Sequence, residues 1–153
     1  HLLIVDKIKG TLSEVKNLCR QMVRQHKCEV IFIDHVSLIK PENPKVPRYE
    51  QFAEISNELQ KLQRELGIAL VVVMQLGRGT EGKPPELSDL RESGAFEQDA
   101  DCVMLLHRER VTEQNTESVK ASLLVAKNRN GACGMAKLVF KPRTIQFTDE
   151  KGN

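Results

Sequence analysis

The chain of 153 residues is poor in aromatic side chains and has almost no excess charge. It contains no tryptophan and one tyrosine, and its formal net charge is +2. A balance this close to neutral does not by itself indicate a nucleic-acid partner, so any basic surface has to be local. Hydrophobic residues make up 40% of the chain and charged residues 29%, which is typical of one globular domain with a core.

Paired cysteines and long apolar runs are also missing. The four cysteines form no Cys-x-x-Cys pair and have no histidine at zinc-ligand spacing: Cys19, Cys28, Cys102 and Cys133. We interpret them as thiols of a reducing compartment, three of them buried in apolar segments, and expect no zinc site. No apolar run is long enough to span a membrane. The chain begins at His1 on a strand-like run, so we expect it to be a piece of a longer protein.

Apolar runs that alternate with amphipathic helices predict an α/β fold. Strands are expected at 2–5, 30–33, 68–74, 101–106 and 119–126, the second, third and fourth of them buried on both faces. Helices are expected at 12–26, behind a Thr11–Glu14 capping box, at 52–66, closed by Gly67, and at 95–100. This order predicts a mainly parallel sheet, and the alternation around Pro142 predicts a C-terminal antiparallel hairpin.

Two of the predicted strands end in a polar residue that could act on a ligand. Asp34 follows 30–33 and Gln75 follows 68–74. Ligands of open α/β sheets bind at the carboxyl ends of the strands. A carboxylate there commonly holds Mg²⁺, directly or through water, beside nucleotide phosphates. The alternative is that these polar residues do no more than end a strand.

One apparent phosphate-binding motif is rejected. Residues 77–83 fit the first seven positions of G-x-x-x-x-G-K-[ST], but the eighth position is Pro84. The hydroxyl that binds Mg²⁺ is therefore absent, and Pro84 and Pro85 lack the N–H groups that would hold phosphate. We treat the match as a coincidence in a Gly/Pro-rich loop, and the sequence contains no other phosphate loop.

Four stretches resemble the C-terminal motor domain of the DnaB-type replicative DNA helicases, which are hexameric rings with a RecA-like, P-loop NTPase fold. Residues 30–34 resemble the Walker B strand, and 74–76 resemble the strand end that presents a phosphate-sensing glutamine. Residues 87–101, LSDLRESGAFEQDAD, are very close to the most distinctive segment of the family, and 126–131, AKNRNG, resemble its Lys-x-Arg-x-Gly turn. The first two matches are common to RecA-like ATPases, whereas the last two are specific.

The resemblance implies ATP and Mg²⁺ as cofactors and a role for each matched residue. Asp34 would help to place Mg²⁺, directly or through water, against the β- and γ-phosphates, and Gln75 would bind the γ-phosphate or the attacking water. Lys127 and Arg129, spaced to share a face, would reach the nucleotide of a neighbouring subunit. A solvated loop residue and a solvated basic turn remain the alternatives for Gln75 and for the Lys–Arg pair.

The resemblance also implies contact with single-stranded DNA through Arg91, Glu92 and Gly94. Gly94 would let the backbone approach a phosphate, Arg91 would add charge, and Glu92 would orient Arg91. Because aromatic residues make up 4% of the chain and none lies in this loop, binding is expected to follow the DNA backbone. The alternative is an exposed turn in which Ser93 caps the helix. Primase and a helicase loader are further expected partners, in the cytoplasm of a bacterium or of a phage-infected bacterium.

Some positions depart from the family pattern. Asp34-His35-Val36-Ser37 is closer to phage helicase–primases than to bacterial members, so a bacterial, phage or plasmid origin stays open. The Walker A loop and the catalytic glutamate of the family would lie before His1. We therefore expect residues 1–153 to be the C-terminal part of one motor domain, with an incomplete sheet and no ATP hydrolysis by itself. A non-catalytic module for assembly or DNA contact and a RecA-like recombination ATPase are the alternatives.

Overall fold

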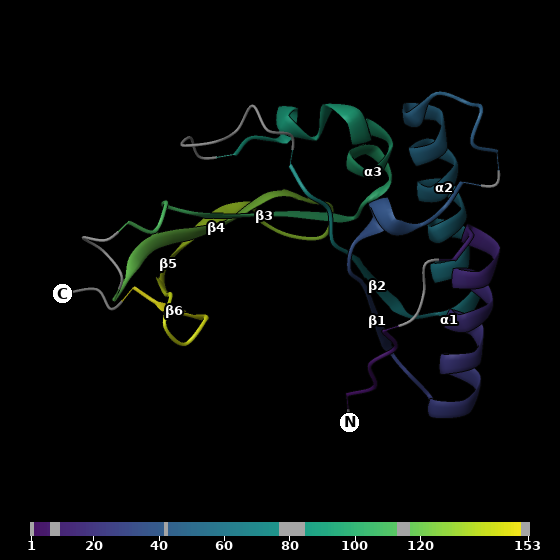
Figure 1. Ribbon diagram of the computed structural model, residues 1–153, viewed down its shortest axis with the longest axis horizontal. Coiled ribbons are helices and arrows are strands. Elements are labelled where there is room, and N and C mark those ends of the chain that lie inside the picture. Colours follow the sequence, from purple (N-terminus) through teal and green to yellow (C-terminus); the bar gives the residue numbers. More distant parts are fainter. Residues whose placement is uncertain (1, 7–9, 42, 77–84, 113–116, 151–153) are drawn as a thin grey trace. The chain divides into compact units, whose positions relative to one another are not determined.

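The structure is a computed structural model that describes residues 2–6, 10–41, 43–76, 85–112 and 117–150. The chain divides into two units (Figure 1). The first unit comprises residues 1–75 and 92–99, and the second comprises 76–91 and 100–153. The architecture of each unit follows from its own strands and helices. No helix in the described part of the chain is long and apolar enough to cross a membrane.

The first unit is built on a pair of parallel strands. β1 (Val30–Ile33) pairs with β2 (Ala69–Val72), from Val30 opposite Ala69 to Ile33 opposite Val72. The helices α1 (Leu12–His26), α2 (Arg48–Leu66) and α3 (Gly94–Asp99) and the short 3-10 helix η1 (Val36–Leu38) complete the unit. Figure 1 shows α2 as the crossover between the two strands, with α1 beside it. The strand–helix–strand order is the one that the sequence predicts.

Local sequence signals set the ends of both long helices. The Thr11 side chain accepts from the Glu14 N–H, and the Glu14 carboxylate accepts from the Thr11 N–H at 2.7 Å, which confirms the capping box. Gly67 ends α2 in the left-handed conformation with a φ of 63°, as predicted. α2 begins at Arg48, four residues before the predicted start at Phe52, because Pro47 already provides the turn that opens the helix.

The core of the first unit lies between its sheet and its two long helices. Leu62 and Val36 are fully buried, with Ile55 and Leu59 beside them. The strand side chains that pack against this cluster alternate along β1 and β2: Ile31, Ile33, Leu70 and Val72. The helices therefore cover one face of the strand pair.

The prediction that these strands are buried on both faces is wrong. Val30 is 48% exposed and Phe32 66% exposed, on the face turned away from the core. An unbroken apolar run indicates that a strand can be buried on both faces, but whether other segments pack on both faces depends on the rest of the protein. The strand predicted at 2–5 is also absent, and these four residues are 48–81% exposed. Without a neighbouring strand to satisfy its N–H and C=O groups, an apolar segment has no reason to be extended.

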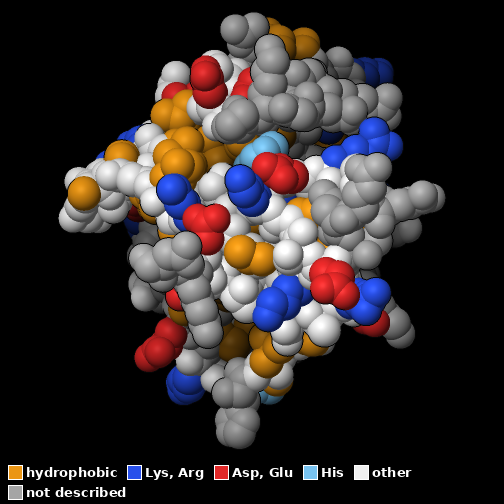
Figure 2. All heavy atoms as spheres, turned by 90° about the vertical axis from the view of Figure 1, so that its left-hand side faces the viewer, with side chains coloured by type: hydrophobic (Ala, Val, Ile, Leu, Met, Phe, Trp, Pro, Cys, Tyr) orange, Lys and Arg blue, Asp and Glu red, His pale blue; other side chains and the backbone are white. Residues whose placement is uncertain are grey.

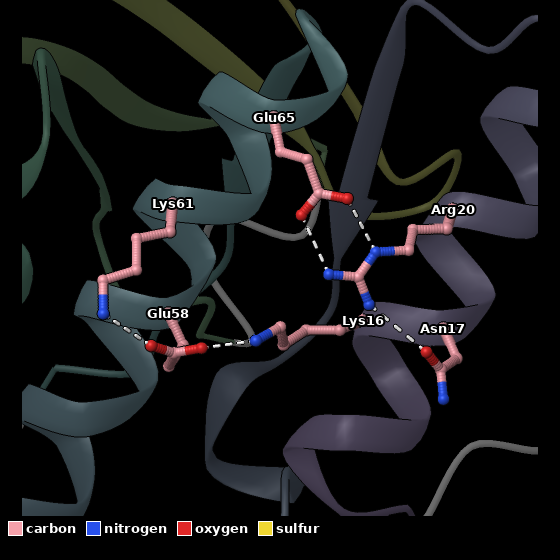
Figure 3. Close-up of polar contacts among 6 residues, drawn as sticks. All are labelled: Lys16, Asn17, Arg20, Glu58, Lys61 and Glu65. Carbon is pink, nitrogen blue, oxygen red and sulfur yellow. Dashed lines mark hydrogen bonds and ion pairs between the residues drawn. The ribbon is translucent and has the colours of Figure 1, made fainter.

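Ion pairs join α1 to α2 on the surface of the first unit (Figure 3). The Glu58 carboxylate of α2 accepts from Lys16 of α1 and from Lys61 at 2.8 Å. Further along the two helices, Arg20 of α1 donates two hydrogen bonds of 2.8 Å to the Glu65 carboxylate. Bidentate geometry and the shared position of Glu58 make this a network rather than a set of isolated surface pairs.

The network predicts a loss of stability in acid. The hydrogen bond from Lys16, and after it the one from Lys61, lowers the pKa of Glu58 to about 2. Because this pKa lies below that of the unfolded chain, the stabilisation is complete above about pH 4.5 and is lost as the pH falls towards 2. With the Glu58 side chain 27% exposed, we expect the free energy of unfolding to fall by about 1–2 kcal/mol across this window.

Urea unfolding between pH 2 and 6 measures this effect. Glu58→Gln should remove the step between pH 4.5 and 2, whereas Glu54→Gln, an exposed position on the same helix, should keep it. A Glu58→Gln protein with an unchanged pH dependence would assign the acid sensitivity to other carboxylates.

The second unit is an antiparallel sheet of four strands in chain order. It consists of β3 (Cys102–Arg108), β4 (Val119–Asn128), β5 (Gly134–Lys141) and β6 (Gln146–Asp149). β5 and β6 form the predicted C-terminal hairpin, from Leu138 opposite Asp149 to Lys141 opposite Gln146. A small cluster of Val119, Ala121 and Phe140 is buried on the sheet, with the Phe147 ring 4.8 Å from that of Phe140.

The sheet of the second unit corrects two further expectations. β3 is not a buried parallel strand but pairs antiparallel to β4, and its Met104 and Leu106 are more than half exposed. Of the four cysteines, which are all free thiols, only Cys19 is buried, while Cys102 and Cys133 are exposed. The α/β class is confirmed. The described strands form two separate sheets.

Candidate functional site

Asp34 stands at the carboxyl end of β1, where the chain leaves the sheet. The parallel pairing continues just past the strands, because the Val73 N–H donates to the Ile33 carbonyl at 2.9 Å and the Val36 N–H donates to the Val73 carbonyl at 3.1 Å. Asp34 lies between these two bonds, its side chain is exposed, and its peptide bond to His35 is cis. The backbone on both sides of this carboxylate is therefore tied to the neighbouring strand.

Gln75 follows β2 at the same edge of the same sheet. It lies two residues after Val73, whose N–H and C=O make the bonds to the β1 side, and its side chain is exposed. The parallel register of β1 and β2 thus brings the predicted acid and the predicted amide to neighbouring strand ends. This is the arrangement expected from the two strand-end positions in the sequence.

The side chains at this edge fit a nucleotide-bound magnesium ion better than a metal held by protein alone. No group of three or more His, Cys, Asp or Glu side chains in the described part of the chain could hold a metal ion. Magnesium keeps several waters and is bound through one or two carboxylates together with phosphate oxygens. One exposed carboxylate, Asp34, beside an uncharged amide that can donate to phosphate, meets that requirement. The rejected motif at 77–83 lies outside the described residues.

The second unit carries the basic pair. Lys127 lies opposite Val103 in the pairing of β3 with β4, and the Arg129 N–H continues the ladder by donating to the Asp101 carbonyl at 2.8 Å. Positions 101 and 103 are two apart on their strand, so Lys127 and Arg129 share a face, as the spacing predicts. A register shift between Val103 and Met104 comes just before these two positions.

The register shift is a bulge in β4. Met104 lies opposite Val125 and Val103 lies opposite Lys127, so Ala126 has no partner across the ladder. Bulges of this kind redirect side chains next to binding sites and are frequent there. Here the bulge comes immediately before the two basic residues.

Sequence reasoning missed two residues that shape the surroundings of Arg129. The Asp101 carboxylate accepts from the Arg129 guanidinium at 2.9 Å. The Asn128 side chain accepts from the Asn130 N–H at 3.2 Å and donates to the Ala132 carbonyl at 3.3 Å. Asp101 and Arg129 are 28 residues apart, so no local sequence pattern predicts their contact.

The turn that carries Arg129 packs its glycine closely against a side chain. A β-carbon at Gly131 would lie 2.9 Å from the Asn128 side-chain nitrogen, closer than such contacts normally come. The glycine of the Lys-x-Arg-x-Gly pattern therefore leaves room for the Asn128 amide to close the turn. The close packing of Gly131 against Asn128 is thus a structural reason for a glycine that the sequence analysis had identified only by resemblance.

The predicted DNA-contacting residues lie where a short helix begins. Arg91 and Glu92 belong to the 3-10 helix η3 (Leu87–Ser93), and Gly94 is the first residue of α3. The side chains of Arg91 and Glu92 lie outside the described part of the structure. A β-carbon at Gly94 would meet no atom within 4 Å. Packing within the chain therefore gives no reason for a glycine at position 94.

The far end of α3 is anchored on α2. The buried Ser56 hydroxyl donates to the Asp99 carboxylate at 2.7 Å, and the Gln60 amide donates to the Asp99 carbonyl at 3.1 Å. The rings of Phe52 and Phe96 meet edge to face with centroids 6.2 Å apart. These contacts fix α3, and with it the end of the loop that precedes it, to the longest helix of the first unit.

Charge on the drawn face of the molecule is mixed. Figure 2 shows Lys and Arg side chains interspersed with Asp and Glu side chains rather than gathered in one basic field. This agrees with the net charge of +2. A polyanionic ligand would therefore have to be bound by particular side chains and N–H groups, not by the charge of the whole chain.

Similarity to solved structures places the chain in the class of RecA-like ATPase domains. One solved ATPase domain is similar over 93% of this chain and 52% of its own, with a TM-score of 0.79 and 31% sequence identity. A DnaB-like replicative helicase, described with its interactions with primase, is similar over 86% of this chain and 34% of its own, with a TM-score of 0.73 and 33% identity.

The chain belongs to the family of the DnaB-like helicase C terminal domain, whose model matches residues 1–149. The replicative DNA helicase DnaB of Treponema pallidum is 44% identical over 146 residues, 95% of this chain and 32% of that protein. The replicative DNA helicase DnaB of Leifsonia xyli is 38% identical over 152 residues, 97% of this chain and 33% of that protein. The chain thus spans about a third of the length of the curated relatives that it matches.

Proposed function

We propose that the protein carrying this chain is an ATP-dependent replicative DNA helicase, which translocates on single-stranded DNA and unwinds duplex DNA at the replication fork. Residues 1–153 would form the C-terminal portion of its single motor domain. The observation that carries the proposal is the family match over residues 1–149 together with Asp34 and Gln75 at adjacent strand ends. Relatives that match nearly the whole chain are replicative DNA helicases.

Asp34 and Gln75 would serve the nucleotide. Bound Mg²⁺ supplies positive charge that neutralises the β- and γ-phosphates of ATP. The Asp34 carboxylate would hold that ion, directly or through a water. The Gln75 amide would hydrogen-bond to the γ-phosphate or the attacking water, and it can donate without changing its own protonation state. The backbone bonds around Ile33, Val36 and Val73 support this role because they fix both strand ends.

Lys127 and Arg129 would act on the nucleotide of a neighbouring subunit. Their shared face and the glycine turn support a role in which two cations are presented together. A guanidinium donates in a fixed fork that matches phosphate oxygens, and an arginine supplied in trans stabilises the charge of the transition state. The role requires a homo-oligomer, for which we propose a hexameric ring.

Arg91, Glu92 and Gly94 would contact single-stranded DNA. The open space around Gly94 and the anchored helix α3 behind it support a backbone that a phosphate can approach closely. Such binding follows the phosphates and depends on salt rather than on base sequence. Primase and a helicase loader are proposed as partners of the intact protein. Its place would be the cytoplasm of a bacterium, with a chromosomal, plasmid or phage gene as the source.

ATP hydrolysis with and without single-stranded DNA tests the proposal. The assay compares this chain with a version extended upstream by about one further half-domain. We expect the chain itself to be inactive, because it contains no phosphate-binding loop, and the extended protein to be active and stimulated by DNA. In the extended protein, Arg129→Ala should lower turnover about 1000-fold or more while ATP binding is kept.

Measurements of ring assembly, DNA binding, strand exchange and duplex unwinding on the same extended protein separate the alternatives. An extended protein that assembles or binds DNA but never hydrolyses ATP would support a non-catalytic module. Activity that depends on DNA but is coupled to strand exchange rather than to unwinding would support a recombination ATPase. Either result would overturn the helicase assignment.

A further inference from the structure

Arg129 is held by one residue through two different groups. The Asp101 carbonyl accepts from the Arg129 N–H at 2.8 Å, and the Asp101 carboxylate accepts from the Arg129 guanidinium at 2.9 Å. The first bond fixes the backbone from which the side chain starts, and the second fixes the charged end of that side chain. The second contact restricts the conformations open to the Arg129 side chain.

The other end of the turn is fixed as well. Asn128 bonds to the backbone on both sides of Gly131, and a β-carbon at Gly131 would force the Asn128 amide to shift. Asn128 itself lies opposite Cys102, the first residue of β3, which directly follows Asp101. Arg129 therefore leaves a hydrogen-bonded turn and meets the Asp101 carboxylate.

The exposure of the Asp101–Arg129 ion pair indicates that it contributes little to the stability of the fold. The Asp101 side chain is 66% exposed and the Arg129 side chain 46% exposed. An ion pair so open to water contributes little to folding stability, because solvent screens the attraction. A guanidinium has five N–H donors, which is more than one carboxylate can accept from in a single plane. The contact with Asp101 therefore orients the guanidinium.

We propose that Asp101 is a positioning residue for Arg129, which holds the guanidinium ready for a phosphate presented by a neighbouring subunit. This inference rests on the proposed role of Arg129 in trans and adds a residue to which no role has been given. Asp101 would not touch the nucleotide. It would restrict the Arg129 side chain to conformations close to the one that acts on the phosphate. A misplacement of about 1 Å is enough to slow catalysis roughly a hundredfold.

The test uses the intact protein and three variants of one position, with a matched control elsewhere. Asp101→Ala should lower kcat for DNA-stimulated ATP hydrolysis about 10- to 100-fold, with the Kd for MgATP changed less than about twofold. Asp101→Glu keeps the charge and an acceptor, so it should recover kcat to within about threefold of wild type. Asp101→Asn keeps the shape but loses the charge and should fall between them.

The control is Asp149→Ala, an exposed aspartate of β6 in the same sheet. It should leave kcat and Kd unchanged. Ring assembly and Tm should be the same in all four variants and in wild type, because the pair is too exposed to support the fold.

Each outcome has a separate meaning. An Asp101→Ala protein with wild-type kcat, beside an Arg129→Ala protein that is inactive, would overturn this inference and leave the proposed function standing. A lowered Tm with no recovery in Asp101→Glu would also overturn it, since the residue would then be structural. If Arg129→Ala retained full turnover, the proposed role of Arg129 would fail together with this inference. If the intact wild-type protein hydrolysed no ATP, the proposed function itself would fail.

Discussion

Mixing an Asp34→Asn protein with an Arg129→Ala protein is expected to restore ATP hydrolysis that neither variant has alone. Each variant alone should be about 1000-fold slower than wild type, because one lacks the proposed Mg²⁺ ligand and the other lacks the cation proposed to act in trans. In a mixed ring, an Arg129→Ala subunit keeps Asp34 and can receive Arg129 from an Asp34→Asn neighbour. Random mixing in equal amounts makes about one interface in four intact, which predicts roughly a quarter of the wild-type rate if interfaces act independently.

A protein that carries both substitutions is the control for this experiment. In a ring that mixes this double variant with Arg129→Ala, no subunit carries Arg129, so ATP hydrolysis should not recover. The rate should rise with the time allowed for subunits to exchange. If mixed rings form and stay inactive, Arg129 does not act on a neighbour's nucleotide, and the requirement for a ring loses its support.

Replacing Leu62 by alanine is expected to lower the free energy of unfolding by about 3 kcal/mol, within a range of roughly 2–5. Leu62 is fully buried in the cluster that joins α2 to the strand pair. Its truncation would remove apolar contacts and leave a cavity that the surrounding helices and strands can fill only in part. The urea midpoint of unfolding should fall while the dependence of the free energy on urea stays the same.

Leu38→Ala is the matched control, because Leu38 loses the same atoms but is 45% exposed. It should cost less than about 1 kcal/mol. Equal losses in the two variants would mean that the cluster around Leu62 is not the main support of the first unit. A changed urea dependence in Leu62→Ala alone would indicate that the first unit no longer unfolds in one step.

Local chemistry explains why the helices could be predicted from the sequence. The reciprocal bonds of Thr11 and Glu14 and the left-handed Gly67 depend on residues at most four apart, so the sequence contains all of the information. The strand ends at Asp34 and Gln75 were predictable for a related reason. A parallel strand pair brings like ends together whatever else surrounds it.

Features that depend on distant segments could not be predicted. The exposure of Val30 and Phe32 depends on what covers the second face of the strand pair, which their own composition does not state. The pairing of β3 with β4 reversed the expected parallel order, because an apolar strand fits either direction. The contact of Asp101 with Arg129 needed the register of two strands and could not be found from spacing alone.

The unpaired Ala126 has a consequence for how this turn can be moved or redesigned. Counted without interruption from the pair Met104–Val125, the two strands would bring Asp101 opposite the uncharged Asn128. The extra residue shifts the pairing of the two strands by one position, so that Arg129 lies opposite Asp101 instead. The extra residue Ala126 thereby determines that Asp101 lies opposite Arg129. A graft of the Lys-x-Arg-x-Gly turn onto another antiparallel sheet would therefore have to carry the irregular residue before it, or the arginine would be transferred without its carboxylate.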